Sequence, residues 1–363
     1  HPPKSFMSDN QLIAGIMSGT SLDGLDVAFC RFAQSGSNIT FSLEHAETVS
    51  YDADWKQKLQ GAYDLDGASL ISLHAEFGRY IGHQLNRIEE QVGLSATLIS
   101  SHGHTVFHRP DKGFTFQMGS GASIAATTGI DTVCDFRTTD VALNGQGAPL
   151  VPIGDRLLFG GHRFCLNLGG IANISYEQGD DVLAFDICPT NMALNLLASE
   201  AGMEFDVDGR MAMEGAVNDN LLNNLRELNM YKKTGPVSFG RESFDAEFKP
   251  LISDKNIPLN DRMRTVCDHV AERIAAVLFK APGTTMLTTG GGAFNSYLVE
   301  AIDEQVSKRG IHVVVPDPSI VSFKEALIFA LLGWLRMREE VNTFASVTGA
   351  TNNSIGGCVY LGA

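Results

Sequence analysis

Two apolar runs near the start of the chain, residues 12–17 and 25–32, flank a short segment of glycine and hydroxylated residues. The pattern predicts a β-hairpin, because each run suits a strand and the residues between them favour a tight turn. Small residues let backbone N–H groups approach an anion closely, and hydroxyl groups add further donors. The hairpin tip is therefore a candidate phosphate site, and an ordinary turn is the alternative.

Size and composition limit the classes of protein to which the chain can belong. A length of 363 residues is sufficient for two domains. A hydrophobic content of 44%, with 19% charged residues and 37 glycines, is typical of a soluble α/β protein. The net charge of −15 argues against a surface for nucleic acid or for an anionic membrane.

Targeting signals and cysteine usage favour the cytoplasm. The first residues lack the apolar core of a signal peptide, and no uninterrupted apolar run reaches membrane-spanning length. The six cysteines are scattered without a CxxC pair, which favours reduced thiols over a disulfide framework or a zinc site. We therefore expect a cytoplasmic protein.

Strand and helix patterns alternate along the chain. Apolar residues spaced by three and four predict helices over 70–92, ending at Gly93, and over 263–277. Strands are predicted at 41–49, 97–101 and 285–289, and one further strand ends at Asp186 before a helix over 189–201. A second hairpin with a glycine turn is predicted over 164–175, similar in shape to the first, which suggests one hairpin in each domain. Residues 143–149 are the best candidate for an interdomain connection.

A third glycine segment, residues 289–295, lies between a predicted strand and a predicted helix. Backbone without side chains can lie against a flat nucleoside there, and a tight turn capped by Asn295 or Ser296 is the alternative. Other nucleotide and hydrolase motifs are excluded. Leu25 stands where a P-loop requires lysine, no GxGxxG opens a helix after the first strand, and no GxSxG elbow is present.

The two hairpins and the third glycine segment, in this order, resemble the superfamily of sugar kinases, actin and heat-shock ATPases. The resemblance implies an α/β fold with two related domains of the actin-like ATPase (ribonuclease H-like) type and an interdomain nucleotide cleft. The implied domains are residues 10–145 with about 338–363, and residues 146–337. A nucleotide-binding regulator without catalysis is disfavoured, because no basic appended segment is apparent.

Six sequence blocks resemble the anhydro-N-acetylmuramic acid kinase family: 15–26, 101–105, 144–150, 167–173, 290–292 and 346–350. The resemblance implies an ATP- and Mg²⁺-dependent kinase that opens 1,6-anhydro-N-acetylmuramic acid with water and phosphorylates the released 6-oxygen. The product is N-acetylmuramic acid 6-phosphate, an intermediate of cell-wall recycling. The family also implies a homodimer, while the charge and composition predict no membrane or nucleic-acid partner.

Site residues follow from the same resemblance. Asp186 matches the family's catalytic aspartate, and an N-cap or a salt-bridge partner is the alternative. The implied ATP and phosphate ligands are Gly19, Thr20, Ser21, Asp23, Gly24, Asp26, Gly169, Gly170, Gly290, Gly291 and Gly292, with Asp23 also expected to bind Mg²⁺. The implied sugar ligands are His102, Arg137, Asp140 and Glu325. For Arg137 and Asp140 a structural ion pair is the alternative, and for Glu325 a capping box with Ser322 is slightly favoured.

The chain departs from the family pattern at two places. The block from Asp186 to Asn191 carries Cys188 and Thr190 where the family usually has glycine, which predicts a less flexible backbone and a tighter pocket. A kinase of the same fold for a different amino sugar is therefore a second hypothesis. His104 stands where glutamine is commoner. A metal site at His102, His104 and His108 is disfavoured, since no carboxylate cluster accompanies them.

Overall fold

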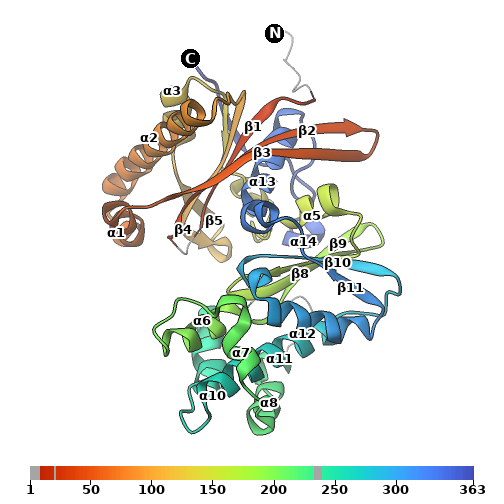
Figure 1. The fold of residues 1–363 in the computed structure, drawn as a ribbon. Helices are drawn as coiled ribbons and strands as arrows, with labels where there is room; N and C mark the ends of the chain where they lie inside the picture. Colours follow the sequence, from red (N-terminus) through yellow and green to blue (C-terminus); the bar gives the residue numbers. More distant parts are fainter. Residues whose placement is uncertain (1–8, 20–21, 233–238) are drawn as a thin grey trace. The chain divides into compact units, whose positions relative to one another are not determined.

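The computed structural model describes residues 9–19, 22–232 and 239–363, so Thr20 and Ser21 of the first hairpin lie outside the described residues. The chain divides into two compact units (Figure 1). The first unit is His1–Leu158 with Phe323–Ala363, and the second is Phe159–Ser322. Residues 146–158 and 323–337 thus group with the first unit in this division.

The first unit is built on a mixed sheet with the strand order β12-β6-β4-β1-β2-β3, and β5 also pairs with β4. Strands β1, β2 and β3 form an antiparallel meander, while β4 runs parallel to β1 and to β6. The strands are β1 (Leu12–Ser18), β2 (Gly24–Ser35), β3 (Asn38–Ser50), β4 (Leu98–Arg109), β5 (Phe114–Met118), β6 (Thr132–Cys134) and β12 (Cys358–Tyr360). The first hairpin and the strand predicted at 41–49 are confirmed.

Helices cover both faces of this sheet (Figure 1). Alternate residues of β1 face opposite sides. Leu12, Ala14 and Ile16 pack in a core with α1 (Ala53–Gly61), α2 (Gly67–Val92) and α3 (Gly121–Thr128). Gly15 lies on the other face, against α13 (Pro318–Met337). The shorter helices are α4 (Thr138–Ala142), α5 (Pro152–Phe159) and α14 (Ala345–Thr348).

Helix α13 is the one helix of the described residues that is long and apolar enough to cross a membrane by length and composition. Most of its apolar window is buried inside the protein, and Trp334 is fully buried. Core helices of soluble proteins share this composition, so the helix is accounted for by packing.

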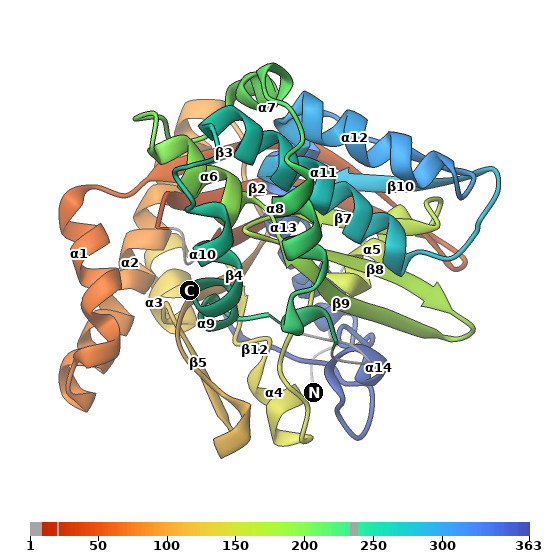
Figure 2. The same ribbon diagram turned by 90° about the horizontal axis from the view of Figure 1, so that it is seen from below.

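The second unit contains a five-stranded sheet with the order β11-β10-β7-β8-β9. Its strands are β7 (Phe164–Leu168), β8 (Ile171–Gln178), β9 (Asp181–Pro189), β10 (Thr284–Thr289) and β11 (Ile311–Val314). Helices α6, α11 and α12 pack together against β7 and β8 in one core, and they lie on one face of the sheet (Figures 1 and 2). The helices are α6 (Asn191–Ser199), α7 (Arg210–Glu214), α8 (Asp219–Arg226), α9 (Arg241–Ser243), α10 (Lys249–Ile252), α11 (Leu259–Val277) and α12 (Ser296–Ser307).

The two sheets repeat one topology. In each unit the first strand, β1 or β7, pairs antiparallel with the following strand and parallel with a later strand, β4 or β10. The third strand of each meander, β3 or β9, then lies at one edge. This repetition agrees with the expectation of two related α/β domains, each with a hairpin at its centre.

Several predicted limits are wrong, among them the following three. Strand β4 does not end at Ser101 but continues through Gly103, whose φ of +74° is accommodated by an irregularity in the pairing with β1. Strand β9 continues three residues beyond Asp186, to Pro189. Helix α13 begins at Pro318, so Ser322 lies inside the helix and the capping box predicted there is wrong.

Candidate active site

The two strands of the first hairpin are held in place where they approach its tip. The Ser18 hydroxyl, at the end of β1, accepts a hydrogen bond from the Tyr51 hydroxyl (2.8 Å) and contacts His104 Nδ1 (3.2 Å). Gly24 begins β2, and a Cβ there would lie 2.6 Å from both Val49 O and Thr48 Cγ2. Close approach of β3 therefore requires this glycine. Gly19 and the exposed Asp23 border the tip, on either side of the two residues outside the described range.

Asp26 is half-buried on β2 directly opposite Thr48 of β3. The Thr48 hydroxyl donates a hydrogen bond of 2.6 Å to its carboxylate. Burial raises the pKa of Asp26 and the charge of Asp23 adds to this rise, whereas the Thr48 bond lowers the pKa. A nearby cation would relieve the repulsion between these two carboxylates, which are three residues apart on the hairpin.

His102 and Arg137 form a buried pair. His102 Nδ1 lies 2.8 Å from Gly103 O and can only donate there, so Nε2 is left to accept hydrogen bonds from Arg137 Nε and Nη2 (3.0 and 2.9 Å). Burial, together with the Arg137 charge, holds the pKa of His102 well below its usual value, and the imidazole is neutral. Arg137 Nη1 also donates to Gly147 O. Burial lowers the pKa of Arg137 to about 10, and the guanidinium remains charged at neutral pH.

Glu325 lies in the second turn of α13 instead of at a helix cap. Although the Glu325 side chain is exposed, nearby protein atoms partly desolvate its carboxyl group, and this desolvation raises the pKa. Arg137 opposes this rise and Asp26 adds to it, so Arg137, Asp26 and Glu325 lie close enough to influence one another electrostatically. The first unit thus places two carboxylates and a guanidinium in one neighbourhood.

Asp140 is buried, and both of its oxygens are used within the protein. Gly147 N and the Thr348 hydroxyl donate to Oδ2 and Oδ1, each at 2.7 Å. These two bonds connect α14 with the loop that comes after α4. No ion pair between Asp140 and Arg137 is found in the described part of the chain, so the structural alternative to sugar binding takes another form, with Asp140 bonded to backbone and hydroxyl groups.

The three histidines of β4 have separate partners. His104 contacts Ser18, His108 Nδ1 lies 3.2 Å from the Thr115 hydroxyl, and His102 holds Arg137. Within residues 9–19, 22–232 and 239–363, no group of three or more His, Cys, Asp or Glu side chains could hold a metal ion.

The second hairpin turns at Gly169 and Gly170, next to the start of α6. Gly170 O accepts hydrogen bonds from Thr190 N and Met192 N, and Gly169 O accepts one from Asn191 N. The N–H groups of Gly169 and Gly170, by contrast, make no backbone hydrogen bond within the described residues. Such amides suit an anion.

The third glycine segment packs on β7. A Cβ on Gly290 would lie 2.5 Å from Asn167 Oδ1, and one on Gly292 would lie 2.7 Å from Leu168 Cβ. Gly291 is exposed, and its nearest neighbour would be Asn191 Nδ2 at 3.5 Å. Asn295 caps α12 by accepting from Leu298 N, which confirms the cap. Packing therefore explains two of the three glycines, and Gly291 is the one open to a ligand.

Asp186 is half-buried in β9, opposite Asn173 of β8. The next aligned pair is Ala172 with Cys188, so Ile187 is the extra residue of a β-bulge. The bulge allows Ile187 and Cys188 to be buried side by side while Asp186 keeps access to solvent. The sequence predicts Asp186 at the very end of the strand, but it lies within β9, next to this bulge.

A residue that the sequence does not single out holds the Asp186 carboxylate. Phe239 N donates a hydrogen bond of 2.8 Å to Asp186 Oδ2. The Phe239 ring packs edge-on against Tyr231, and the Tyr231 hydroxyl is hydrogen bonded to His269 of α11 (3.0 Å). The carboxylate is thus oriented by a backbone amide that is itself anchored to the core of the second unit.

Cys188 and Thr190, the two departures from the family pattern, are fully buried. Cys188 belongs to the core of the second unit, and Thr190 N donates to Gly170 O. The φ of Thr190 is −128°, which any residue can adopt, and Cys188 has no positive φ. Cys188 packs in the core and Thr190 is buried, so neither side chain is exposed to solvent. The tighter pocket stays a prediction.

Comparison with known proteins agrees with the resemblance. The family model for anhydro-N-acetylmuramic acid kinase matches residues 11–362. Curated anhydro-N-acetylmuramic acid kinases of Vibrio vulnificus and Gloeobacter violaceus are 33% and 34% identical, and the matches cover 98% and 94% of this chain and 99% and 96% of theirs. The enzyme of Bacillus cereus is 31% identical over 96% of this chain and 98% of its own. The chain therefore belongs to the anhydro-N-acetylmuramic acid kinase family.

Proposed function

We propose that the protein opens the 1,6-anhydro ring of anhydro-N-acetylmuramic acid with water and transfers the γ-phosphoryl group of ATP to the released 6-oxygen. The match of the family model over residues 11–362 carries this proposal. A family match of this extent makes the chain an ATP-dependent phosphotransferase acting on a small amino sugar. The product is N-acetylmuramic acid 6-phosphate, and the reaction belongs to cell-wall recycling in the cytoplasm.

Asp186 is the general base in this proposal. The carboxylate takes a proton from water as the water oxygen bonds to the anomeric carbon. The bond between that carbon and the bridging 6-oxygen breaks, and this oxygen attacks the γ-phosphorus as the bond to ADP breaks. The hydrogen bond from Phe239 N supports the assignment, because a base has to be held in one orientation.

The hairpin amides and glycine segments are the proposed ATP ligands. Gly19, Thr20, Ser21, Gly24 and Asp26 in the first unit, and Gly169 and Gly170 in the second, would contact the phosphates. In the third glycine segment, Gly291 would contact the adenosine, and Gly290 and Gly292 would hold the segment against β7. The carboxylate oxygens of Asp23 suit Mg²⁺. Burial raises the pKa of Asp26 and the charge of Asp23 adds to this rise, so a cation between the two carboxylates would be favourable. The ion would neutralise charge on the transferred phosphoryl group.

The sugar contacts are proposed for the polar neighbourhood of the first unit. Arg137 would bind the lactyl carboxylate and Glu325 a hydroxyl group. His102 would position Arg137 through its neutral imidazole. Asp140, whose oxygens are both used by Gly147 and Thr348, would hold the loop and not the sugar. The homodimer stays a prediction.

An isotope experiment tests the reaction. Full-length protein is incubated with ATP, Mg²⁺ and 1,6-anhydro-N-acetylmuramic acid in ¹⁸O-water, and the products are analysed by mass spectrometry. We expect a 6-phosphate sugar with one ¹⁸O at the anomeric carbon and an unlabelled phosphate group. Unlabelled product incubated in ¹⁸O-water without protein corrects for exchange. Label in inorganic phosphate, with unmodified sugar, would show ATP hydrolysis alone and contradict the proposal.

Replacing Arg137 tests the proposed carboxylate contact. Arg137→Gln is expected to raise the KM for the sugar about 10- to 100-fold, the cost of losing a hydrogen bond to a charged group, and to leave the KM for ATP unchanged. With the methyl ester of the sugar, wild type and variant should have similar KM values. Arg109→Gln, which removes an exposed guanidinium paired with Asp111, is the matched control. An equal rise of KM for the acid and the ester would assign Arg137 a structural role.

A further inference from the structure

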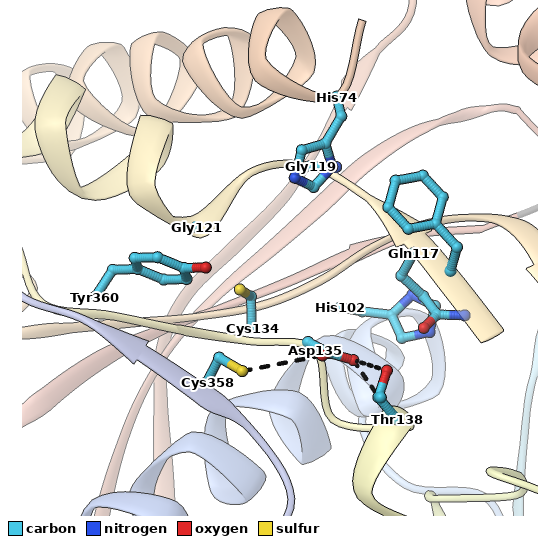
Figure 3. Close-up of a pocket in the computed structure, with 11 residues that line it drawn as sticks. His74, His102, Gln117, Gly119, Gly121, Cys134, Asp135, Thr138, Cys358 and Tyr360 are labelled. Carbon is cyan, nitrogen blue, oxygen red and sulfur yellow. Dashed lines mark hydrogen bonds between the residues drawn. The ribbon is translucent and has the colours of Figure 1, made fainter. Parts of the chain in front are cut away.

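Two cysteines face a small cavity in the first unit (Figure 3). The cavity has a volume of about 190 Å³ and is lined by residues that include His74, Gln117, Cys134, Asp135, Cys358 and Tyr360. The proposed function uses neither thiol. The other cysteines, Cys30, Cys165, Cys188 and Cys267, are buried.

The strand register places these two cysteines directly opposite each other. Strand β12 pairs antiparallel with β6, and Cys358 is aligned with Cys134. Directly opposite residues of an antiparallel pair have their side chains on the same face, with Cα atoms about 4.5 or 5.5 Å apart. A disulfide requires a Cα separation of about 4.4–6.8 Å. Both possible spacings meet this requirement without movement of the backbone.

The two thiols differ in access. Cys358 is exposed on β12. Cys134, on the neighbouring strand β6, is half-buried and lies against Gly121 of α3. Cys358 Sγ also lies 3.9 Å from Asp135 Oδ2. An incoming reagent therefore meets Cys358 first, and Cys134 is the neighbour that can complete the reaction.

We propose that Cys134 and Cys358 form a dithiol site that reacts with low-molecular-weight disulfides to give a cross-strand disulfide. The Cys358 thiolate attacks one sulfur of the reagent, forms a mixed disulfide and releases one thiol. The Cys134 thiolate then attacks Cys358 Sγ, and the second thiol leaves. Both protein thiols lose their protons to solvent, the protein is oxidised by two electrons, and the reagent disulfide is reduced to two thiols.

The surroundings set the pH at which the site reacts. Burial, followed by the charge of Asp135, raises the pKa of Cys134 to about 12. Burial and Asp135 also raise the pKa of Cys358. Since the thiolate is the attacking species, the reaction is slow at neutral pH and becomes faster as the pH rises.

The site adjoins the segment that carries Arg137. Asp135, between Cys134 and α4, accepts hydrogen bonds from the Thr138 hydroxyl (2.6 Å) and Thr138 N (3.4 Å). A disulfide draws Cys358 Sγ from Asp135 toward Cys134 and so disturbs the turn that leads into α4. This consequence rests on the proposed function, in which Arg137 binds the sugar.

Mass spectrometry of the full-length protein tests the site. The protein is incubated with oxidised glutathione at pH 8.5, quenched with acid, alkylated and digested. Wild type should lose two hydrogens and yield one cross-linked pair of peptides containing residues 134 and 358. Cys134→Ser should stop at a glutathione adduct on Cys358, and Cys358→Ser should react slowly or not at all. A stable adduct on wild-type Cys358, or a disulfide to any other cysteine, would overturn the proposal.

Kinetics of the same samples test the consequence separately. Oxidised wild type should show a KM for the sugar raised about threefold or more, a change equal to the free energy of one weak hydrogen bond, with reversal by dithiothreitol. Cys358→Ser should show no change on treatment. An unchanged KM in fully cross-linked protein would overturn the link to Arg137 while the dithiol site stands. Absence of kinase activity in the reduced protein would contradict the proposed function and leave the mass result unaffected.

Discussion

Asp186→Asn is expected to lower kcat by about 10²- to 10⁴-fold, the usual contribution of a general base, while ATP still binds. The amide has the shape of the carboxylate and can still accept the hydrogen bond from Phe239 N, so the bulge in β9 should be retained. The amide cannot take a proton from water. The expected defect is therefore in the chemical step and not in folding or nucleotide binding.

Asp181→Asn is the matched control, since it makes the same chemical change at an exposed position of the same strand. Turnover is measured by product formation, and ATP binding by calorimetry with a non-hydrolysable analogue. The control should retain wild-type turnover. If Asp186→Asn keeps more than about a tenth of the wild-type rate, well above the residual activity expected without a base, Asp186 does not have this role.

Periodic elements could be predicted from the sequence because their pattern is local. The two hairpins show apolar runs on both sides of a glycine turn, and α2 shows spacings of three and four before Gly93, which has a φ of +70°. The same holds for α11. The repetition of the hairpin then predicts two related units, and the strand order of both sheets agrees.

Element limits were mispredicted where a local signal competes with tertiary structure. The spacing of Ser322 and Glu325 is that of a capping box, yet α13 begins at Pro318, because proline is tolerated in the first turn of a helix, and Ser322 is internal. Gly103 looks like the end of a strand, but its positive φ is absorbed by an irregularity within β4. The bulge at Ile187 depends on pairing with β8, which sequence periodicity does not report.

The candidate site depends on contacts between distant residues, and these have no sequence signature. Phe239 lies 53 residues from Asp186, and Tyr51 lies 33 residues from Ser18. The resemblance to a family proposes Asp186, Arg137 and Glu325 as site residues. It does not predict that the Phe239 amide bonds to Asp186 or that the His102 imidazole bonds to Arg137. The register between Cys134 and Cys358 likewise appears only when β12 is placed beside β6.

Gly15→Ala is expected to destabilise the first unit by about 3 kcal/mol or more, at or above the upper end for overpacking of a core. A Cβ at this position would lie 2.0 Å from Ala326 O and 2.7 Å from Ala330 N, both backbone atoms of α13. A side chain could rotate away, but a helix backbone cannot, and Trp334 and its buried neighbours fix α13 in place. The melting temperature should fall by about 6–12 °C.

Gly61→Ala is the matched control, because its Cβ would meet nothing within 4 Å and its φ of −81° suits alanine. That variant should melt within about 2 °C of wild type. Activity alone does not separate the possible roles of Gly15, since the residue begins the first of the blocks that resemble the family. The melting temperature separates a packing role from a role in phosphate binding, because loss of phosphate binding would leave the stability of the ligand-free protein unchanged. Equal melting temperatures for the two variants would mean that α13 does not pack on β1 at Gly15, and Glu325 would then lose the helix that places it near Arg137.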